Sequence, residues 1–160
     1  MCRAKSRDDR TWLQVSVAVR GTMASHELDV KPQVGEVPRL IDWIGSCCAG
    51  EGVAEDVTFK LTLAVEEAVI NVINHAFEGL PPPHSIAVRL DIAAQSATAE
   101  IIDNGRPFDP TSAPDPDLSL PLERRCPGGL GIHLMRGMMD RLNYRRSAGS
   151  NILRLEKARR

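Results

Sequence analysis

The sequence predicts an α+β domain in which helices are layered on one face of a largely antiparallel sheet. Two observations carry this prediction. The predicted elements follow the order strand, helix, helix, strand, strand, loop, helix, strand, strand, and the strands in the second half of the chain come in adjacent pairs that short turns can join. With 160 residues, the chain has the length of one domain. We expect this domain over residues 23–160, preceded by an N-terminal extension of unknown role over residues 1–22.

The first part of the predicted domain contains one strand and two helices. Residues 25–30 favour a strand, and residues 34–48 carry apolar side chains at helical spacing, with Pro38 tolerable in a first turn. Residues 55–77 contain neither glycine nor proline, and their apolar side chains recur on one face with a period of 3.6 residues. This spacing predicts a long, well-buried helix that ends before the glycine and prolines of residues 79–83.

The second part of the chain predicts two strand pairs and one more helix around a long loop. Prolines interrupt residues 106–129 throughout, and they block regular structure there. The remaining predicted elements are strands over 85–92 and 97–102 joined by a hairpin at 93–96, a helix over 131–140, and strands over 142–146 and 151–155 around a turn at 148–150.

Composition and charge exclude several functional classes. The chain has 20 Lys and Arg residues against 21 Asp and Glu residues, so it lacks the positive charge that a direct nucleic-acid partner requires. No apolar stretch reaches the ~20 residues of a membrane span, and the N-terminus has no apolar signal core. We therefore expect a soluble, cytoplasmic protein without membrane contact. The four cysteines lack metal or redox spacing and are interpreted as buried or inert thiols.

A polar stripe on the long helix is the first candidate site. Glu67, Asn71 and His75 are spaced i, i+4 and i+8, which places them together beside the apolar face. Ordinary solvation, or a contact between Glu67 and His75 through Asn71, explains such a stripe when the helix is viewed alone.

Two further motifs lie where the predicted strands and the last helix begin or end. Asp103 and Gly105 directly follow a strand, where a tight turn capped by aspartate is the alternative explanation. The glycine-rich residues 128–131 precede a helix, where free backbone N–H groups and the helix dipole attract anions such as phosphate. A flexible loop end explains these glycines as well.

Taken together, the three motifs match one superfamily in order and content. The segments EEAVINVINHAF, IIDNGRPFDP and GGLGIHLMRGMMDRLNY resemble the N, G1 and G2 boxes of the GHKL ATPases, which include gyrase and the histidine kinases. Within this superfamily the chain resembles the anti-sigma factor serine/threonine kinases of bacterial partner switching. The resemblance covers about residues 25–157 and implies a two-layer α/β sandwich, the Bergerat fold.

The resemblance implies roles for four residues. Asn71 would offer its amide oxygen to a Mg²⁺ ion that bridges the phosphates of ATP. Glu67 would accept the proton of the attacking hydroxyl, or orient that hydroxyl. Asp103 would accept a hydrogen bond from the exocyclic amine of adenine, which favours ATP over GTP, and Gly105 would let the backbone lie close to the base.

The resemblance also implies a phosphate-binding loop and a lid. Gly129 and Gly131 would allow close backbone approach to the phosphates, with Leu130 between them in the same cofactor-binding loop. Residues 110–127 would close over the nucleotide as the lid.

Two arginines near the end of this lid are the remaining candidates. Arg124 and Arg125 are placed where a cation could neutralise charge on the transferring phosphoryl group, although two solvated arginines explain the same pattern. We interpret His75 as bracing the site rather than binding metal. Pro107 stands where the wider superfamily has a second glycine, a substitution familiar in the serine-kinase branch.

The leading functional hypothesis is therefore a kinase that phosphorylates a STAS-domain anti-sigma antagonist and sequesters a sigma factor. The family tendency implies a homodimer formed through the sheet and the first helix. A non-catalytic, ATP-gated protein-binding module is the alternative. The catalytic part of a histidine kinase is disfavoured, because only His26, in a strand-like stretch, precedes Glu67 as a phosphoacceptor.

Overall fold

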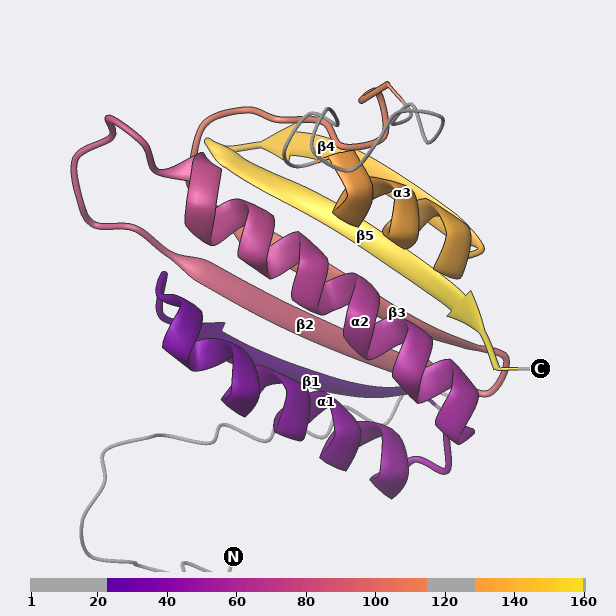
Figure 1. Cartoon of the computed structure of the whole chain (residues 1–160). Coiled ribbons are helices and arrows are strands. Elements are labelled where there is room, and N and C mark those ends of the chain that lie inside the picture. The colour runs from indigo at the N-terminus through magenta and orange to yellow at the C-terminus, as the bar shows by residue number, and fades with distance from the viewer. Residues whose placement is uncertain (1–22, 115–128, 160) are drawn as a thin grey trace, which may run out of the picture.

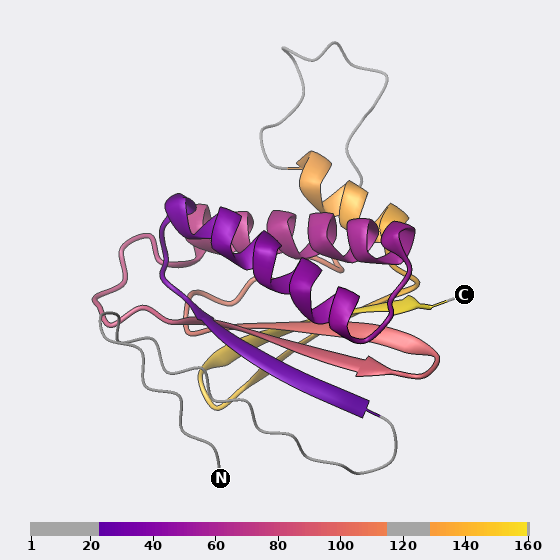
Figure 2. The ribbon, with the colours of Figure 1, turned by 90° about the horizontal axis from the view of Figure 1, so that it is seen from below.

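The computed structural model describes residues 23–114 and 129–159 as a two-layer structure. One layer is a five-stranded antiparallel sheet with the order β1-β2-β3-β5-β4, and the helices of the described residues cover one of its faces (Figures 1 and 2). The strands are β1 Met23–Val30, β2 Ile86–Ala93, β3 Ser96–Asp103, β4 Arg141–Ser147 and β5 Ser150–Ala158. The helices are α1 Val37–Gly50, α2 Glu55–Asn71 and α3 Gly129–Met138, with short turns η1 Val34–Glu36 and η2 Val72–Ala76. This arrangement confirms the predicted fold class.

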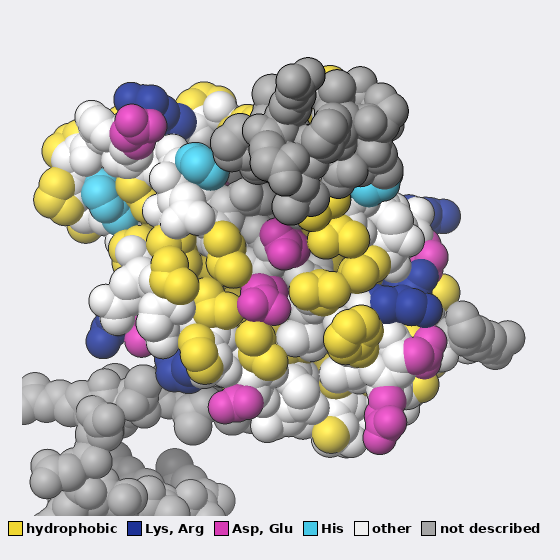
Figure 3. Space-filling view, in the orientation of Figure 1, with side chains coloured by type: hydrophobic (Ala, Val, Ile, Leu, Met, Phe, Trp, Pro, Cys, Tyr) yellow, Lys and Arg dark blue, Asp and Glu magenta, His cyan; other side chains and the backbone are white. Residues whose placement is uncertain are grey.

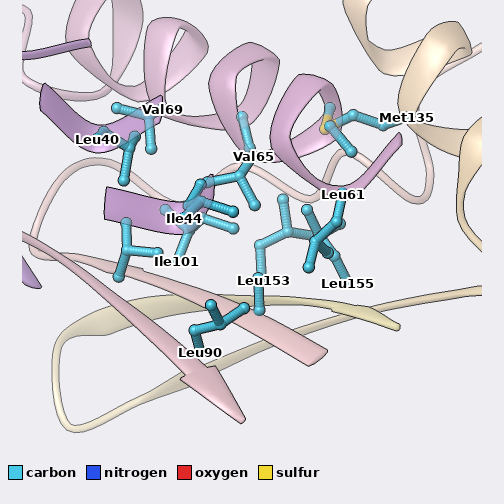
Figure 4. Close-up of a cluster of buried hydrophobic side chains, with 14 of the residues drawn as sticks. Leu40, Ile44, Leu61, Val65, Val69, Leu90, Ile101, Met135, Leu153 and Leu155 are labelled. Atoms are coloured by element: carbon cyan, nitrogen blue, oxygen red, sulfur yellow. The ribbon is translucent and has the colours of Figure 1, made fainter. Parts of the chain in front are cut away.

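The core lies between α2 and the sheet. The side chains of Leu61 and Val65 project from α2 toward Leu90 on β2 and Leu155 on β5, and all four are fully buried (Figure 4). Burying one such side chain stabilises the fold by about 1.5–3 kcal/mol. The apolar stripe predicted on the long helix is thus the surface that attaches the helix layer to the sheet.

The long helix differs from its prediction at its C-terminal end. The α-helix stops at Asn71, and residues 72–76 form the π turn η2. The backbone N–H of Arg106 donates to the Ala76 carbonyl at 2.8 Å, so the end of this turn is bonded to the segment that follows β3. Wide π turns often occur at functional sites, and periodicity alone does not distinguish them from a regular helix.

The other predicted elements are present, with shifted ends. The last helix covers Gly129–Met138 instead of residues 131–140, and β5 extends to Ala158 because its backbone pairs with β3 as far as Ser96. Of the predicted loop and lid, residues 115–128 lie outside the described residues, as do residues 1–22. Within the described part of the chain, no helix is long and apolar enough to cross a membrane.

Charged residues form a ladder on the sheet face that the helices leave open. Glu27, Arg89, Glu100 and Arg154 share one row of the register across β1, β2, β3 and β5. Arg89 pairs with Glu27 at 2.8 Å and with Glu100 at 3.7 Å, and Arg154 pairs with Glu100 at 3.2 Å. Partly exposed pairs contribute only about 0–1 kcal/mol each, so their main effect is to keep this face polar.

The helix-covered face is more apolar. Hydrophobic side chains gather there among a few acidic ones (Figure 3). Phe59, on α2, is 64% exposed and borders a shallow hollow between α1 and α2. The open face of the sheet is therefore polar, whereas the helix-covered face is more apolar.

Candidate functional site

The three sequence motifs converge on one cavity of about 460 Å³ between the helix layer and the sheet. Asn71 and His75 line it from the end of α2 and from η2, Asp103 lines it from β3, and Ile132 lines it from α3. The wall is mostly apolar, with a few polar side chains, and the volume suits a small organic ligand. Segments far apart in the sequence thus build a single candidate site.

Asp103 is the buried acidic group of this cavity. Its side chain accepts hydrogen bonds from the Gly105 N–H at 2.8 Å and from Asn151 Nδ2 at 2.8 Å, and both bonds end on Oδ1. Burial raises the pKa of the Asp103 carboxyl, and these two hydrogen bonds together with the charge of Arg146 oppose the rise. Because the second oxygen carries neither bond, Asp103 can accept a hydrogen bond from a ligand through Oδ2.

Behind Asp103 lies a polar network that the sequence interpretation missed. Asn151 Oδ1 accepts hydrogen bonds from the Tyr144 hydroxyl at 2.8 Å and from Arg146 Nη1 at 2.6 Å. Asn151 occupies an inward-facing position of β5, followed by Leu153 and Leu155 on the same face. A polar residue in an otherwise apolar strand face was the signal that could have identified it.

The lack of a side chain at Gly105 allows the segment after β3 to pack closely against η2. A Cβ atom at this position would lie 2.6 Å from the Ala76 Cβ and 2.7 Å from the Ala76 carbonyl oxygen, so only glycine fits. The neighbouring Asn104 accepts a hydrogen bond from the Ser85 N–H and donates one to the Pro83 carbonyl, each at 2.9 Å. This second anchor was also missed, and the predicted approach of Gly105 to an adenine base stays a prediction.

Glu67 lies against the first turn of α3. The nearest atom to a Cβ built on Gly131 would be Glu67 Oε2, in steric overlap, and Glu67 Cδ would lie at 3.2 Å. The absence of a side chain at position 131 therefore leaves room for the carboxylate. The candidate base and the glycine-rich motif, predicted as separate features, are in contact, and Leu130 beside them is 49% exposed.

Asn71 offers an amide to the cavity wall. Its Nδ2 is buried and has no hydrogen-bond partner among the described residues. Buried amides of this kind are normally satisfied, so an unpaired one at a cavity wall fits a ligand-binding role. No three His, Cys, Asp or Glu side chains of the described residues gather as a metal cage. The unpaired Nδ2 group is a hydrogen-bond donor suited to an oxygen of a ligand, whereas Mg²⁺ would bind the amide oxygen together with water and phosphate oxygens, so the predicted Mg²⁺ role of Asn71 stays a prediction.

The structure describes only some of the remaining predicted site residues. Arg124 and Arg125 lie outside the described residues, and Gly129 is the first residue of α3. His75 is exposed at the cavity wall, and its predicted bracing role stays a prediction.

The start of the predicted lid is anchored to α3. Arg136 Nη2 donates to the carbonyls of Pro110 at 2.9 Å, Thr111 at 3.1 Å and Ala113 at 2.5 Å. A planar guanidinium with fixed donors suits such a set of acceptors. The first residues of the lid segment are therefore tied to the helix that follows the lid.

A family model described as the histidine kinase-like ATPase domain matches residues 30–157. The chain belongs to this family. Membership in the histidine kinase-like ATPase family implies the use of ATP, and the cavity described above is lined by residues from all three sequence motifs of this chain.

Known proteins of related sequence or structure agree with this assignment. The serine/threonine-protein kinase BtrW of Bordetella bronchiseptica is 40% identical over 99 residues, which cover 61% of this chain and 68% of that kinase. This likeness confirms the resemblance to serine/threonine kinases of the GHKL superfamily.

Two solved structures share the fold. The crystal structure of the RsbU and RsbW domains of a Mycobacterium tuberculosis protein matches with a TM-score of 0.60 at 13% identity, over 83% of this chain and 32% of that one. The histidine kinase domain of a blue-light activated kinase from Erythrobacter litoralis matches with a TM-score of 0.51 at 16% identity, over 78% of this chain and 59% of that one. The chain thus spans only part of both proteins, and these likenesses concern the fold.

Proposed function

We propose that this protein is an ATP-dependent serine/threonine kinase that phosphorylates a STAS-domain anti-sigma antagonist and sequesters a sigma factor. The observation that carries the proposal is the contact between Glu67 and Gly131, which places a carboxylate beside the glycine-rich turn expected to hold phosphates. Similarity to a named serine/threonine kinase supports the reaction, and the fold shared with an RsbW domain supports the partner-switching setting.

The proposed mechanism assigns one task to each part of the cavity. Asp103 Oδ2 accepts a hydrogen bond from the adenine amine, and the backbone N–H groups of the first turn of α3 donate to phosphate oxygens. Asn71 would hold Mg²⁺ through its amide oxygen, and the ion would supply positive charge at the phosphates. Arg124 and Arg125 of the lid are proposed to add further positive charge there.

Glu67 acts as the general base in this mechanism. Its carboxylate takes the proton of the substrate serine as the serine oxygen bonds to the γ-phosphorus of ATP. The bond from that phosphorus to the β,γ-bridging oxygen breaks at the same time. The products are phosphoserine and ADP, and the proton remains on Glu67 until it passes to solvent.

The kinase proposal is tested with γ-labelled MgATP and a STAS-domain partner. We expect acid-stable label on a serine of that partner with the wild-type chain, and a loss of about 10²–10⁴-fold in Glu67→Gln with ATP affinity preserved. Glu66→Gln is the matched control, because Glu66 is the neighbouring half-buried glutamate on α2, and it should transfer at the wild-type rate.

Other outcomes of this experiment point elsewhere. Acid-labile label would favour a histidine kinase. Absence of label despite ATP binding and partner capture would favour the non-catalytic, ATP-gated binding module.

The Mg²⁺ assignment has a separate test. Asn71→Ala should lose Mg²⁺-dependent nucleotide affinity while keeping the fold, because Asn71 lies at the cavity wall and not in the buried stripe of α2. Calorimetry with and without Mg²⁺ measures this difference. Unchanged MgATP affinity in the variant would contradict Asn71 as the metal ligand.

The partners and the assembly follow from the same proposal. A sigma factor and a STAS-domain antagonist are cytoplasmic proteins, so we place the kinase in the cytoplasm, with no direct nucleic-acid or membrane partner. We propose a homodimer formed through the sheet and α1. Sedimentation of the purified chain at several concentrations tests this last point, and a monomer at all of them would contradict it.

A further inference from the structure

We propose that Asn151, oriented by Tyr144 and Arg146, is a positioning residue that determines the choice of purine by fixing Asp103 as a hydrogen-bond acceptor. The inference rests on the proposed nucleotide site. It adds to that site a second layer of residues from β4 and β5, of which Arg146 and Asn151 lie outside the three sequence motifs.

The register of the sheet places Asn151 beside Asp103. The two residues are direct partners in the antiparallel pairing of β3 and β5, and both are 5% exposed. Asn151 Nδ2 donates to Asp103 Oδ1 at 2.8 Å and to the Arg106 carbonyl at 2.9 Å. One amide group therefore holds both the carboxylate and the backbone of the turn that follows it.

Two donors on β4 determine which way the Asn151 amide points. Its Oδ1 accepts from Tyr144 at 2.8 Å and from Arg146 at 2.6 Å, and Arg146 also donates to the Gly105 carbonyl at 3.1 Å. An inverted amide would direct its N–H groups at these donors and its oxygen at the Asp103 carboxylate. Because both contacts would then be repulsive, Tyr144 and Arg146 keep the NH₂ group facing Asp103.

This arrangement controls what Asp103 presents to a ligand. With Oδ1 occupied by Asn151 and Gly105, the carboxylate cannot rotate freely, and Oδ2 remains as an acceptor toward the cavity. Adenine places an N–H donor opposite such an acceptor, whereas guanine places a carbonyl oxygen there. Without Asn151, the buried carboxyl could turn or hold a proton, and a protonated carboxyl can donate to the guanine oxygen.

The deciding experiment compares nucleotides with different purine edges, of which ATP and purine riboside triphosphate differ only at the 6-position. ATP, GTP and purine riboside triphosphate, which lacks the amine, are titrated by calorimetry into wild type and Asn151→Leu. We expect ATP affinity to fall by about 10–100-fold in Asn151→Leu, while the affinity for purine riboside triphosphate changes by less than about threefold. The preference for ATP over GTP should narrow by at least about tenfold.

Arg146→Met tests the orienting step from an exposed position, with Arg145→Met as its matched control on the same strand. Arg145 faces away from the helix layer, so Arg145→Met should bind all three nucleotides like wild type. In Arg146→Met, the ratio of ATP affinity to GTP affinity should fall by about three- to tenfold. If Asn151→Leu does not fold, the comparison of Arg146→Met with Arg145→Met tests the inference by itself. Asn151→Ser, which keeps a donor, should recover part of the preference.

The outcomes separate this inference from the proposed function. Equal losses for ATP and purine riboside triphosphate in a folded variant would show a merely structural role for Asn151 and overturn the inference. An unchanged ATP preference in both Asn151→Leu and Arg146→Met would overturn it as well. Failure of the wild-type chain to bind any of the three nucleotides would overturn the proposed function itself.

Discussion

Gly131→Ala should displace the proposed catalytic carboxylate, and because Gly131 also lies in the proposed phosphate-binding turn, phosphoryl transfer and ATP affinity are measured separately. A Cβ atom on Gly131 would overlap Glu67 Oε2 and would lie 3.2 Å from Glu67 Cδ. The overlapped group is the far end of a flexible side chain, so it yields more easily than the backbone of α3. The expected consequence is a displaced Glu67 in an otherwise intact fold.

The size of the effect follows from this overlap. To restore an ordinary van der Waals contact, the carboxylate oxygen must retreat by on the order of 1 Å. A misplacement of about 1 Å costs a reacting group about 10²-fold in rate, so we expect phosphoryl transfer to fall by about 10²–10³-fold. Helix propensity favours alanine over glycine by about 0.5–1 kcal/mol, which should keep the free energy of unfolding within about 1 kcal/mol of wild type.

Three measurements on two variants test this reasoning. Transfer from γ-labelled ATP, ATP binding by calorimetry and urea unfolding are compared for Gly131→Ala and Gly137→Ala. The second variant is the control, because Gly137 lies in the same helix and a Cβ there meets no atom within 4 Å. Wild-type transfer by Gly131→Ala would refute the placement of Glu67 as the base, and loss of ATP affinity would show that the substitution disturbs more than this carboxylate.

Three further predictions concern the core, the thiols and the buried carboxyl. Leu155→Ala removes a side chain with no exposed surface, so the free energy of unfolding in urea should fall by about 2–5 kcal/mol, and a smaller loss would contradict its central place in the core. Burial raises the pKa of the Cys47 thiol to about 11 and raises that of Cys48, so both should resist iodoacetamide at pH 8 in the folded protein and react once urea unfolds it, as mass spectrometry would detect. Burial also raises the pKa of Asp103, so ATP affinity measured by calorimetry should weaken as the pH falls through that raised pKa, because a protonated carboxyl no longer accepts from adenine; an equal pH dependence in Asp103→Asn would assign the effect to another group.

The elements with a clear period could be predicted from the sequence. The apolar stripe of residues 55–77 identified the long helix, and alternating side chains identified the strands of both hairpins. The order of the strands could not be predicted in this way. Whether β4 or β5 lies beside β3 depends on a pairing between distant segments, and both arrangements preserve the same alternation along each strand.

The same distinction applies to the site. Glu67, Asn71 and Asp103 lie in motifs whose spacing resembles a known superfamily, and the structure brings their segments to one cavity or to its edge. Asn151 and Arg146 are single polar residues that lie outside the three motifs. Their contacts with the segment around Asp103 exist only because β5 lies between β3 and β4, a fact that the local sequence does not contain.

The strand order also joins nucleotide binding to folding. The cavity takes its walls from α2, β3, α3 and the β4–β5 hairpin, and α3 rests on the core through Ile132 and Met135, with Met139 buried directly after the helix. A ligand in this cavity touches the final third of the chain as well as the middle, so it binds only when α3 and the last hairpin are in place. A ligand that binds the folded chain and not the unfolded chain stabilises the fold by about 2.7 kcal/mol at a ligand concentration of 100 times its Kd. Nucleotide should therefore protect the backbone amides of α3 and β5 from hydrogen exchange together, because the cavity closes only when both contribute to its wall.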